Sequence, residues 1–220
     1  MFRLKPRVME RQPGNPNVVV LMADRSTSMT YVAHDEIDET IPGFQAIYPG
    51  LRLFGFHSEV TEVVAGGYPD RMRYCQPPCH RGSSEKGAYY RNATYHGVSL
   101  EQIARLNPSL TIILSDGGGA DKTHALQVAD RMTGSIDAYY CDAINSAWQD
   151  RGFMEELARR GRGNFVPFTP GCGQLEVKIR QSIQRIVKIH HHRGETRHVH
   201  HDREHHAMQR APSRVRIIRR

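Results

Sequence analysis

Three oxygen-bearing side chains, Asp24, Ser26 and Ser28, stand at alternate positions directly after the apolar run 18–23. A turn at the end of a strand can direct one carboxylate and two hydroxyls with this spacing at a single point. Hard oxygen ligands with few carboxylates suit Mg²⁺, which requires an octahedral shell and keeps some of its waters. The sequence therefore predicts part of a divalent-metal site, for Mg²⁺ or else Mn²⁺ or Ca²⁺. An Asp-Ser turn that only caps a helix is the alternative.

Two further oxygen ligands come from distant parts of the chain. Asp116 follows a second apolar run, 110–114, and precedes three glycines that leave backbone room beside a site. Thr94 comes just before a predicted helix and could add a third hydroxyl. Ligands bind at the carboxyl ends of parallel strands, where Asp24 and Asp116 are both expected. The complete candidate metal site consists of Asp24, Ser26, Ser28, Thr94 and Asp116.

The segments that must position these ligands alternate between buried-strand patterns and helical patterns. Strands are expected at 18–23, 51–57, 60–65, 110–114, 136–141 and 164–168, and helices at 31–47, 98–106, 121–132, 148–160 and 174–189. The short turn 57–59 implies an antiparallel pair. Pro42 and Gly43 are expected to interrupt the first helix, and Gly161 to end the fourth. The order predicts an α/β fold with a doubly wound, mostly parallel, Rossmann-like sheet and one antiparallel edge strand.

The order of these features resembles the von Willebrand factor type A (vWA) domain with its metal-ion-dependent adhesion site. The residues that carry the resemblance are, in order, Asp24, Ser26, Ser28, Thr94 and Asp116. It extends over about residues 17–190 and includes the antiparallel strand pair after the first helix. Many members have Gly where this chain has Thr27 and Ala93, and neither change removes a ligand.

The resemblance implies a role for each ligand. Ser26 and Ser28 would bind the metal directly through their hydroxyls, and Thr94 directly or through water. Asp24 and Asp116 would act mostly through water and by hydrogen bonds that orient the serines. In this family one coordination position is left for a carboxylate of a partner protein. The resemblance therefore implies a partner that supplies Glu or Asp.

Charge and composition divide the chain into three parts. Residues 1–16 are expected to form a leader, residues 17–190 the vWA-like domain, and residues 191–220 a disordered tail. The tail holds 8 Arg and 3 acidic residues, so it carries +5 of the formal +7 charge. The near-neutral body gives little electrostatic reason to bind nucleic acid. No apolar run is long enough for a transmembrane helix or a secretory signal, so no membrane association is expected.

Four cysteines are too few and too unevenly placed for a disulfide scaffold, which favours a reducing cytoplasm. Cys75, Cys79 and His80 offer three potential zinc ligands within six residues, whereas zinc sites usually need four. A second, zinc-binding site or a loop with two free thiols are the two alternatives. The surrounding loop, 66–92, ends near Thr94, so it should lie beside the metal face. Its Tyr and Arg residues are types enriched where interfaces carry binding energy.

Eight histidines fall between His190 and His206, and seven of them belong to the 191–220 tail. It could chelate transition metals through neutral imidazoles, or bind nucleic acid or another polyanion weakly through its basic end. It could also be a solubilising end that lacks enough apolar residues to order itself.

Three classes of function follow. The leading hypothesis is a non-enzymatic, intracellular, stand-alone vWA-type adaptor that binds an acidic side chain of a partner protein through Mg²⁺. The second is a nucleic-acid- or polyanion-associated protein acting through the tail and the 66–92 loop. The third is a metal-dependent phosphohydrolase, but haloacid-dehalogenase-type phosphatases have a second carboxylate where this chain has Ser26. The chain also lacks a phosphate-binding P-loop motif.

Overall fold

The structure is a computed structural model that describes residues 14–26, 28–29, 31–48, 50–63, 93–142 and 149–186. Its described strands form one sheet in the order β3-β2-β1-β4-β5-β6. In chain order the strands are β1 (Asn15–Asp24), β2 (Leu51–Phe56), β3 (Val60–Val63), β4 (Pro108–Ser115), β5 (Ser135–Cys141) and β6 (Arg162–Phe168). All described pairings are parallel except that of β2 with β3. The predicted mostly parallel, Rossmann-like α/β sheet with one antiparallel edge strand is confirmed.

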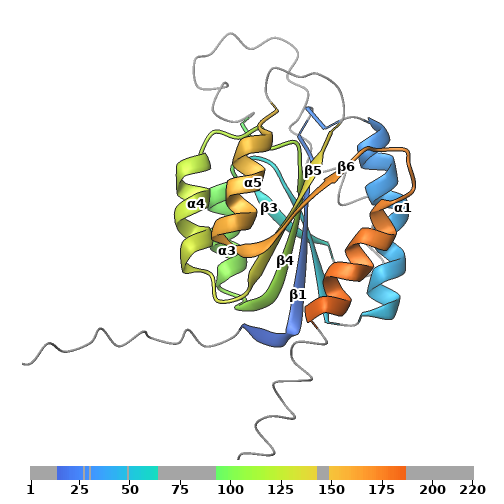
Figure 1. The fold of residues 1–220 in the computed structure, drawn as a ribbon, viewed down its shortest axis with the longest axis horizontal. Helices are drawn as coiled ribbons and strands as arrows, with labels where there is room; N and C mark the ends of the chain where they lie inside the picture. The colour runs from blue at the N-terminus through green and yellow to red at the C-terminus, as the bar shows by residue number, and fades with distance from the viewer. Residues whose placement is uncertain are drawn as a thin grey trace, which may run out of the picture.

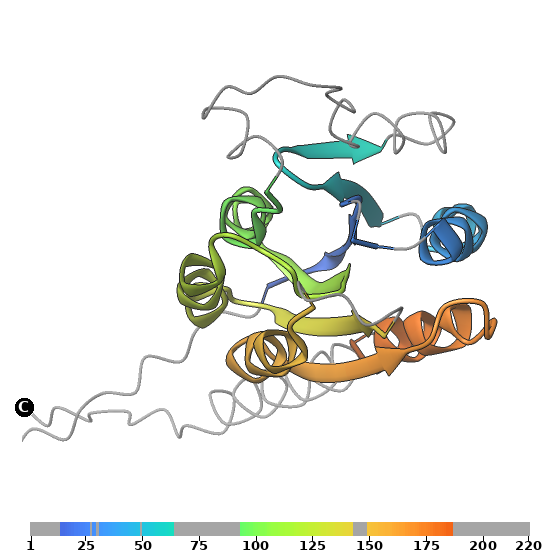
Figure 2. The same ribbon diagram turned by 90° about the horizontal axis from the view of Figure 1, so that it is seen from above.

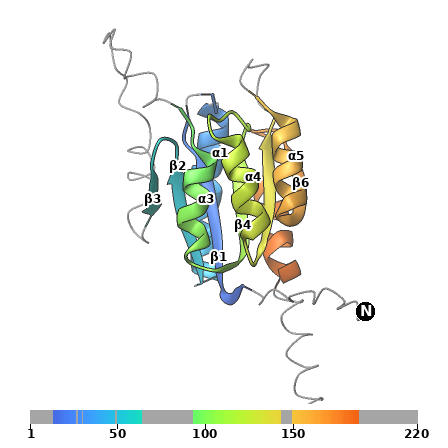
Figure 3. The ribbon, with the colours of Figure 1, turned by 90° about the vertical axis from the view of Figure 1, so that its left-hand side faces the viewer.

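Helices cover both faces of this sheet (Figure 1). They are α1 (Tyr31–Ile47), α3 (His96–Ala104), α4 (Lys122–Arg131), α5 (Arg151–Arg160) and a last helix formed by residues 175–186. Seen from above, α1 and the last helix lie on one face, and α3, α4 and α5 on the other (Figure 2). Figure 3 shows α3, α4 and α5 side by side in front of the sheet. Because all strands except β3 run in the same direction, their carboxyl ends lie together at one end of the sheet, at the top of Figure 1.

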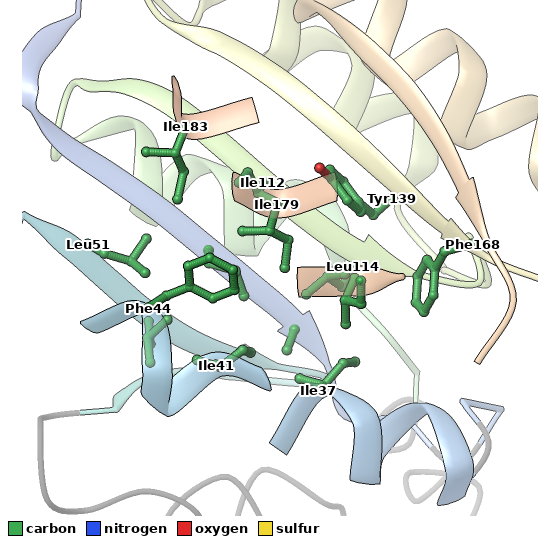
Figure 4. Close-up of a cluster of buried hydrophobic side chains, with 14 of the residues drawn as sticks. Ile37, Ile41, Phe44, Leu51, Ile112, Leu114, Tyr139, Phe168, Ile179 and Ile183 are labelled. Carbon is green, nitrogen blue, oxygen red and sulfur yellow. The ribbon is translucent and has the colours of Figure 1, made fainter. Parts of the chain in front are cut away.

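The central strand β1 is buried on both faces, which explains its continuous apolar run. Val19 and Leu21 join the cluster beneath α1 and the last helix, whereas Val20 and Met22 join the cluster beneath the other helices. Figure 4 shows the first cluster. Its labelled members are Ile37, Ile41, Phe44, Leu51, Ile112, Leu114, Tyr139, Phe168, Ile179 and Ile183. Each such side chain stabilises the fold by about 1.5–3 kcal/mol when fully buried, and together they fix the sheet edge that carries the candidate site.

Helix α1 runs without a break through Pro42 and Gly43, so the expected interruption is wrong. An interior proline costs a helix about 3 kcal/mol. Ile37 and Ile41 before this pair, and Phe44 after it, are all buried against the sheet. Packing of both halves on one apolar surface outweighs the local preference.

Gly161 ends α5 as expected, but not by adopting a left-handed conformation. Its φ is −73°, and the following Arg162 takes the positive φ of 57°. A Cβ atom at Gly161 would lie 2.5 Å from Cβ of Ile136, which is closer than real contacts allow. The glycine is therefore needed for the close approach of α5 to β5.

These two glycines should respond oppositely to alanine. A Cβ at Gly43 would meet nothing within 4 Å, so Gly43→Ala should raise the free energy of unfolding by roughly 0.5–1 kcal/mol. Gly161→Ala should lower it, because Ile136 must move. Urea unfolding followed by circular dichroism measures both. A destabilised Gly43→Ala variant would contradict the unbroken helix.

The structure begins its first strand at Asn15, so the last residues of the expected leader belong to β1. Residues 1–13, the 66–92 loop and the 191–220 tail lie outside the described residues, as do the predictions made for them. Within the described ranges, no helix has the length and apolar character needed to cross a membrane.

Candidate metal centre

The two carboxylates of the predicted site leave the sheet from neighbouring strands. Asp24 is the last residue of β1, and Asp116 directly follows β4. The two strands pair in parallel, with Ala23 opposite Leu114. Both aspartates are buried. The topology thus brings together two residues that are far apart in the sequence.

The turn after β1 folds back on Asp24. The backbone N–H of Ser26 donates to Oδ1 of Asp24 over 2.8 Å, and the N–H of Met29 donates to the carbonyl of Ser26. The hydroxyl oxygens of Ser26 and Ser28 lie 2.9 Å apart. Two hydroxyls are therefore held together within one tight turn beside the Asp24 carboxylate.

Asp116 has one satisfied and one unsatisfied carboxylate oxygen. The N–H of Gly118 donates to Oδ1 over 2.9 Å, whereas Oδ2 is buried and has no hydrogen-bond partner. Gly117 has a φ of +79°, and the carbonyl of Asp150 occupies the position where a side chain would start. A buried carboxylate oxygen without a donor is costly unless a cation or water supplies the missing interaction.

Thr94 lies beside the loop that begins at Asp116. Its carbonyl accepts from the N–H of Ala120 over 2.9 Å, and the next residue, Tyr95, donates its N–H to the carbonyl of His57. The Thr94 side chain is buried. These bonds hold the Thr94 segment between the β2–β3 turn and the loop after β4.

Burial and charge act together on Asp24. Burial, and next the nearby Asp116 carboxylate, raise the pKa of Asp24 to about 7, against hydrogen bonds from Ser115 and Ser26 that lower it. The basic residue next to it does not relieve this charge. The guanidinium of Arg25 donates instead to Asp38 on α1, over 2.8 Å. The candidate site therefore holds two close carboxylates whose ionised forms a cation would stabilise.

Sequence reasoning missed two residues at this site, Ser115 and His96. The Ser115 hydroxyl donates to Oδ2 of Asp24 over 2.6 Å and accepts the N–H of Gly117 over 3.0 Å. Nε2 of His96 lies 3.0 Å from the same hydroxyl. Burial lowers the pKa of His96 to about 4, so its imidazole is neutral at neutral pH. Their only sequence signal is position, since Ser115 precedes Asp116 and His96 follows Thr94 by two residues.

The donor set fits a hard dication. In the described part of the chain, no group of three or more His, Cys, Asp or Glu side chains is placed to hold a metal. The predicted ligands are instead two carboxylates and the hydroxyls of two serines and a threonine, and oxygen donors of this kind suit Mg²⁺. The buried, unpartnered Oδ2 of Asp116 is the atom that most requires such an ion.

The second site, predicted for zinc at Cys75, Cys79 and His80, falls outside the described residues. Of the other two cysteines, Cys141 is buried in the core and Cys172 is exposed. Cys141 belongs to the apolar cluster beneath α1, so it packs there as a small apolar side chain.

One comparison with a solved structure agrees with this fold. No family model matches the chain, and no curated protein matches it in sequence. A crystal structure of the conserved hypothetical protein BatB from Bacteroides thetaiotaomicron is similar, with a TM-score of 0.53 and 13% identity over 78% of this chain and 99% of that chain. An uncharacterized membrane spanning protein from Vibrio fischeri gives a TM-score of only 0.27 at 15% identity, covering 76% and 96% of the two chains. At 13% identity, the similarity to BatB is one of fold alone.

Proposed function

We propose that this chain is a Mg²⁺-dependent protein-binding module that captures an acidic side chain of a partner protein. The observation that carries the proposal is the buried Oδ2 of Asp116, which has no hydrogen-bond donor. The Asp116 carboxylate also lies near a second carboxylate, that of Asp24, which repels it. The paired hydroxyls of Ser26 and Ser28 supply neutral ligands at the same edge of the sheet. A cation would satisfy the orphaned oxygen and offset the repulsion between the carboxylates.

The proposed ligands are those predicted from the sequence: Asp24, Ser26, Ser28, Thr94 and Asp116. A bound dication supplies an electrophilic centre that attracts a carboxylate from outside the protein. The residues prepare this centre in different ways. The serine hydroxyls are neutral donors, so they leave positive charge on the ion. Asp24 is already engaged by Ser26 and Ser115, which limits how much of its charge reaches the ion directly.

A catalytic role is not proposed for this site. Asp24, Ser115 and His96 form a hydrogen-bonded set of three residue types that recur in hydrolases. In hydrolases the histidine lies between the serine and the acid, so that it can take the serine proton. Here the serine lies between the other two and directs its proton to Asp24. Ser115 is also fully buried, so no substrate can reach its hydroxyl.

The proposed function predicts EDTA-sensitive capture of a partner. A pull-down with the full chain should retain a partner in Mg²⁺ and release it in EDTA. The double variant Ser26→Ala with Ser28→Ala should fold but show no Mg²⁺-dependent retention, because two neutral ligands are lost. Mass spectrometry of the retained fraction, with quantification of the bound partner, measures both effects.

Ser109→Ala provides the matched control for this experiment. Ser109 is another buried serine, located near the amino end of β4, where its hydroxyl donates to the carbonyl of Val18. Its loss should leave Mg²⁺-dependent retention unchanged. Undiminished Mg²⁺-dependent capture by the Ser26/Ser28 double variant would refute the site.

A further inference from the structure

We propose that His96 is a positioning residue for the metal centre, because it fixes the direction in which the Ser115 hydroxyl points. This inference rests on the proposed Mg²⁺ site and adds a residue to it. His96 is not a metal ligand. It keeps the proton of the Ser115 hydroxyl directed at Oδ2 of Asp24.

The Ser115 hydroxyl has a single proton to donate. That oxygen has three neighbours: Oδ2 of Asp24 at 2.6 Å, the N–H of Gly117 at 3.0 Å and Nε2 of His96 at 3.0 Å. An ionised Asp24 can only accept, so it takes the serine proton. The Gly117 amide can only donate. Nε2 of His96 must therefore donate as well, and the imidazole carries its proton on Nε2.

The opposite direction of donation is disfavoured. If Ser115 donated to Nε2, the imidazole proton would sit on Nδ1 of His96, which is buried and has no partner. A buried donor left without an acceptor destabilises the fold. Oδ2 of Asp24 would also lose the donor that Ser115 supplies, although Oδ1 would keep the N–H of Ser26. The Nε2–H form of His96 thus keeps the Ser115 proton directed at Oδ2 of Asp24.

The imidazole is held so that it cannot easily turn away from Ser115. Its ring makes edge contacts with Phe56 of β2 and Phe153 of α5, with centroid distances of 5.2 and 5.1 Å. A Cβ at Gly119 would lie 2.5 Å from Nδ1, so only glycine allows the ring this close to the loop after Asp116. Contacts from three elements fix the ring plane and aim Nε2 at the hydroxyl.

His96 also links the segments that bring the ligands. It opens α3, two residues after Thr94, and contacts the residue that precedes Asp116 and binds Asp24. In metalloproteins, residues that hydrogen-bond to the metal ligands orient those ligands, and their loss typically lowers metal affinity 10–100-fold. His96 would act in this way on Asp24, through Ser115.

The first test is the imidazole proton itself. In protein labelled with ¹⁵N at histidine and loaded with Mg²⁺, two-bond ¹H–¹⁵N correlation spectra should show His96 as the neutral Nε2–H tautomer. Comparison with the His96→Gln variant assigns the signal. An Nδ1–H tautomer for His96 would overturn the proposal.

The second test measures affinity for Mn²⁺ alone, with free Mn²⁺ quantified by electron paramagnetic resonance. Ser115→Ala and His96→Phe should each weaken Mn²⁺ binding at least about tenfold. His96→Gln should stay within roughly threefold of wild type, because its amide can donate from nearly the same position. Thr111→Val, which removes another fully buried hydroxyl from β4, should bind as wild type does.

The outcomes separate this role from the metal site itself. Wild-type affinity in both Ser115→Ala and His96→Phe would overturn the positioning role and leave the site intact. A wild-type protein that binds neither Mn²⁺ nor Mg²⁺ would refute the site and the role together. Thermal unfolding in EDTA identifies any variant that fails to fold. If His96→Phe is one of them, the tautomer of His96 in the first test decides: Nε2–H supports the positioning role and Nδ1–H overturns it.

Discussion

Replacing Asp24 by Asn is expected to make the metal-free protein more stable at pH 8 and to remove its response to Mg²⁺. Burial and the neighbouring Asp116 raise the pKa of Asp24 to about 7 in the folded protein, from an ordinary value of 3.8. The folded state therefore holds this proton more tightly than the unfolded state does. Asn is nearly isosteric and carries no charge, so the variant avoids the repulsion that the carboxylate creates.

The pH dependence has a definite sign. Because the folded-state pKa is raised, the stability contributed by the protonated carboxyl is fully present below about pH 4 and is lost as pH rises through 7. The loss is on the order of 4 kcal/mol when complete. In EDTA, wild-type stability should therefore fall between pH 5 and 8 more steeply than that of the Asn variant.

Mg²⁺ should offset most of this loss, and in the wild type only. At a hundredfold excess over its dissociation constant, a ligand that binds only the folded state adds about 2.7 kcal/mol, or roughly 5–10 °C in melting temperature for a chain of this size. Differential scanning calorimetry at pH 8, with Mg²⁺ and with EDTA, measures the shift. An Asp24→Asn protein that still gains several degrees with Mg²⁺ would show that the ion binds elsewhere.

Asp137→Asn is the matched control for charge removal. Asp137 is another fully buried strand aspartate, but it accepts from Arg185 over 2.6 and 2.7 Å and from the N–H of Asn164. Its neutralisation should destabilise the protein in EDTA and leave the Mg²⁺-induced shift in place. The two aspartates thus separate the cost of an uncompensated buried charge from the benefit of a paired one.

The second large effect is expected from Asp38→Ala. Arg25 is only 1% exposed, and its guanidinium donates to both carboxylate oxygens of Asp38 over 2.8 and 3.3 Å. Removing one partner of a buried ion pair leaves the other charge uncompensated, which typically costs several kcal/mol. Because Asp38 is itself 19% exposed, water can reach the pair, and we expect a loss of about 3 kcal/mol.

Two comparisons test the cause of that loss in urea unfolding experiments. Glu62→Ala breaks the Arg52–Glu62 pair, in which both side chains are 37% exposed, and should cost no more than about 1 kcal/mol. The double variant Arg25→Met with Asp38→Leu removes both charges, so it should be more stable than Asp38→Ala alone. Equal stability of Asp38→Ala and Glu62→Ala would show that burial of Arg25 contributes nothing.

The fold could be predicted from local patterns because its central strands, β1 and β4, are covered on both faces by helices. The run 18–23 is continuously apolar for this reason, and it lies in the centre of the sheet. The unbroken helix through Pro42 could not be predicted, since it depends on packing against strands that are distant in the sequence. The same holds for Gly161, whose role depends on its contact with Ile136.

The candidate site, too, could be predicted only in part. Asp24 and Asp116 could be placed together because strand order brings the ends of β1 and β4 to one edge. The roles of Ser115 and His96 required side-chain directions, which no spacing rule supplies. Arg25 was equally unpredictable, because arginines are almost never fully buried unless paired, and its partner lies thirteen residues away on α1.

The bond between Ser115 and Asp24 joins residues 91 positions apart in the chain. Closing so long a segment is entropically costly, and contacts of this range are characteristic of slowly folding topologies. A cation that needs both strand ends meets no complete site until β1 and β4 have paired. Its binding energy is then gained mostly after the folding barrier, so it lowers the rate of unfolding and leaves the rate of folding nearly unchanged. For this protein, Mg²⁺ would therefore lengthen the lifetime of the folded state without guiding the chain towards it.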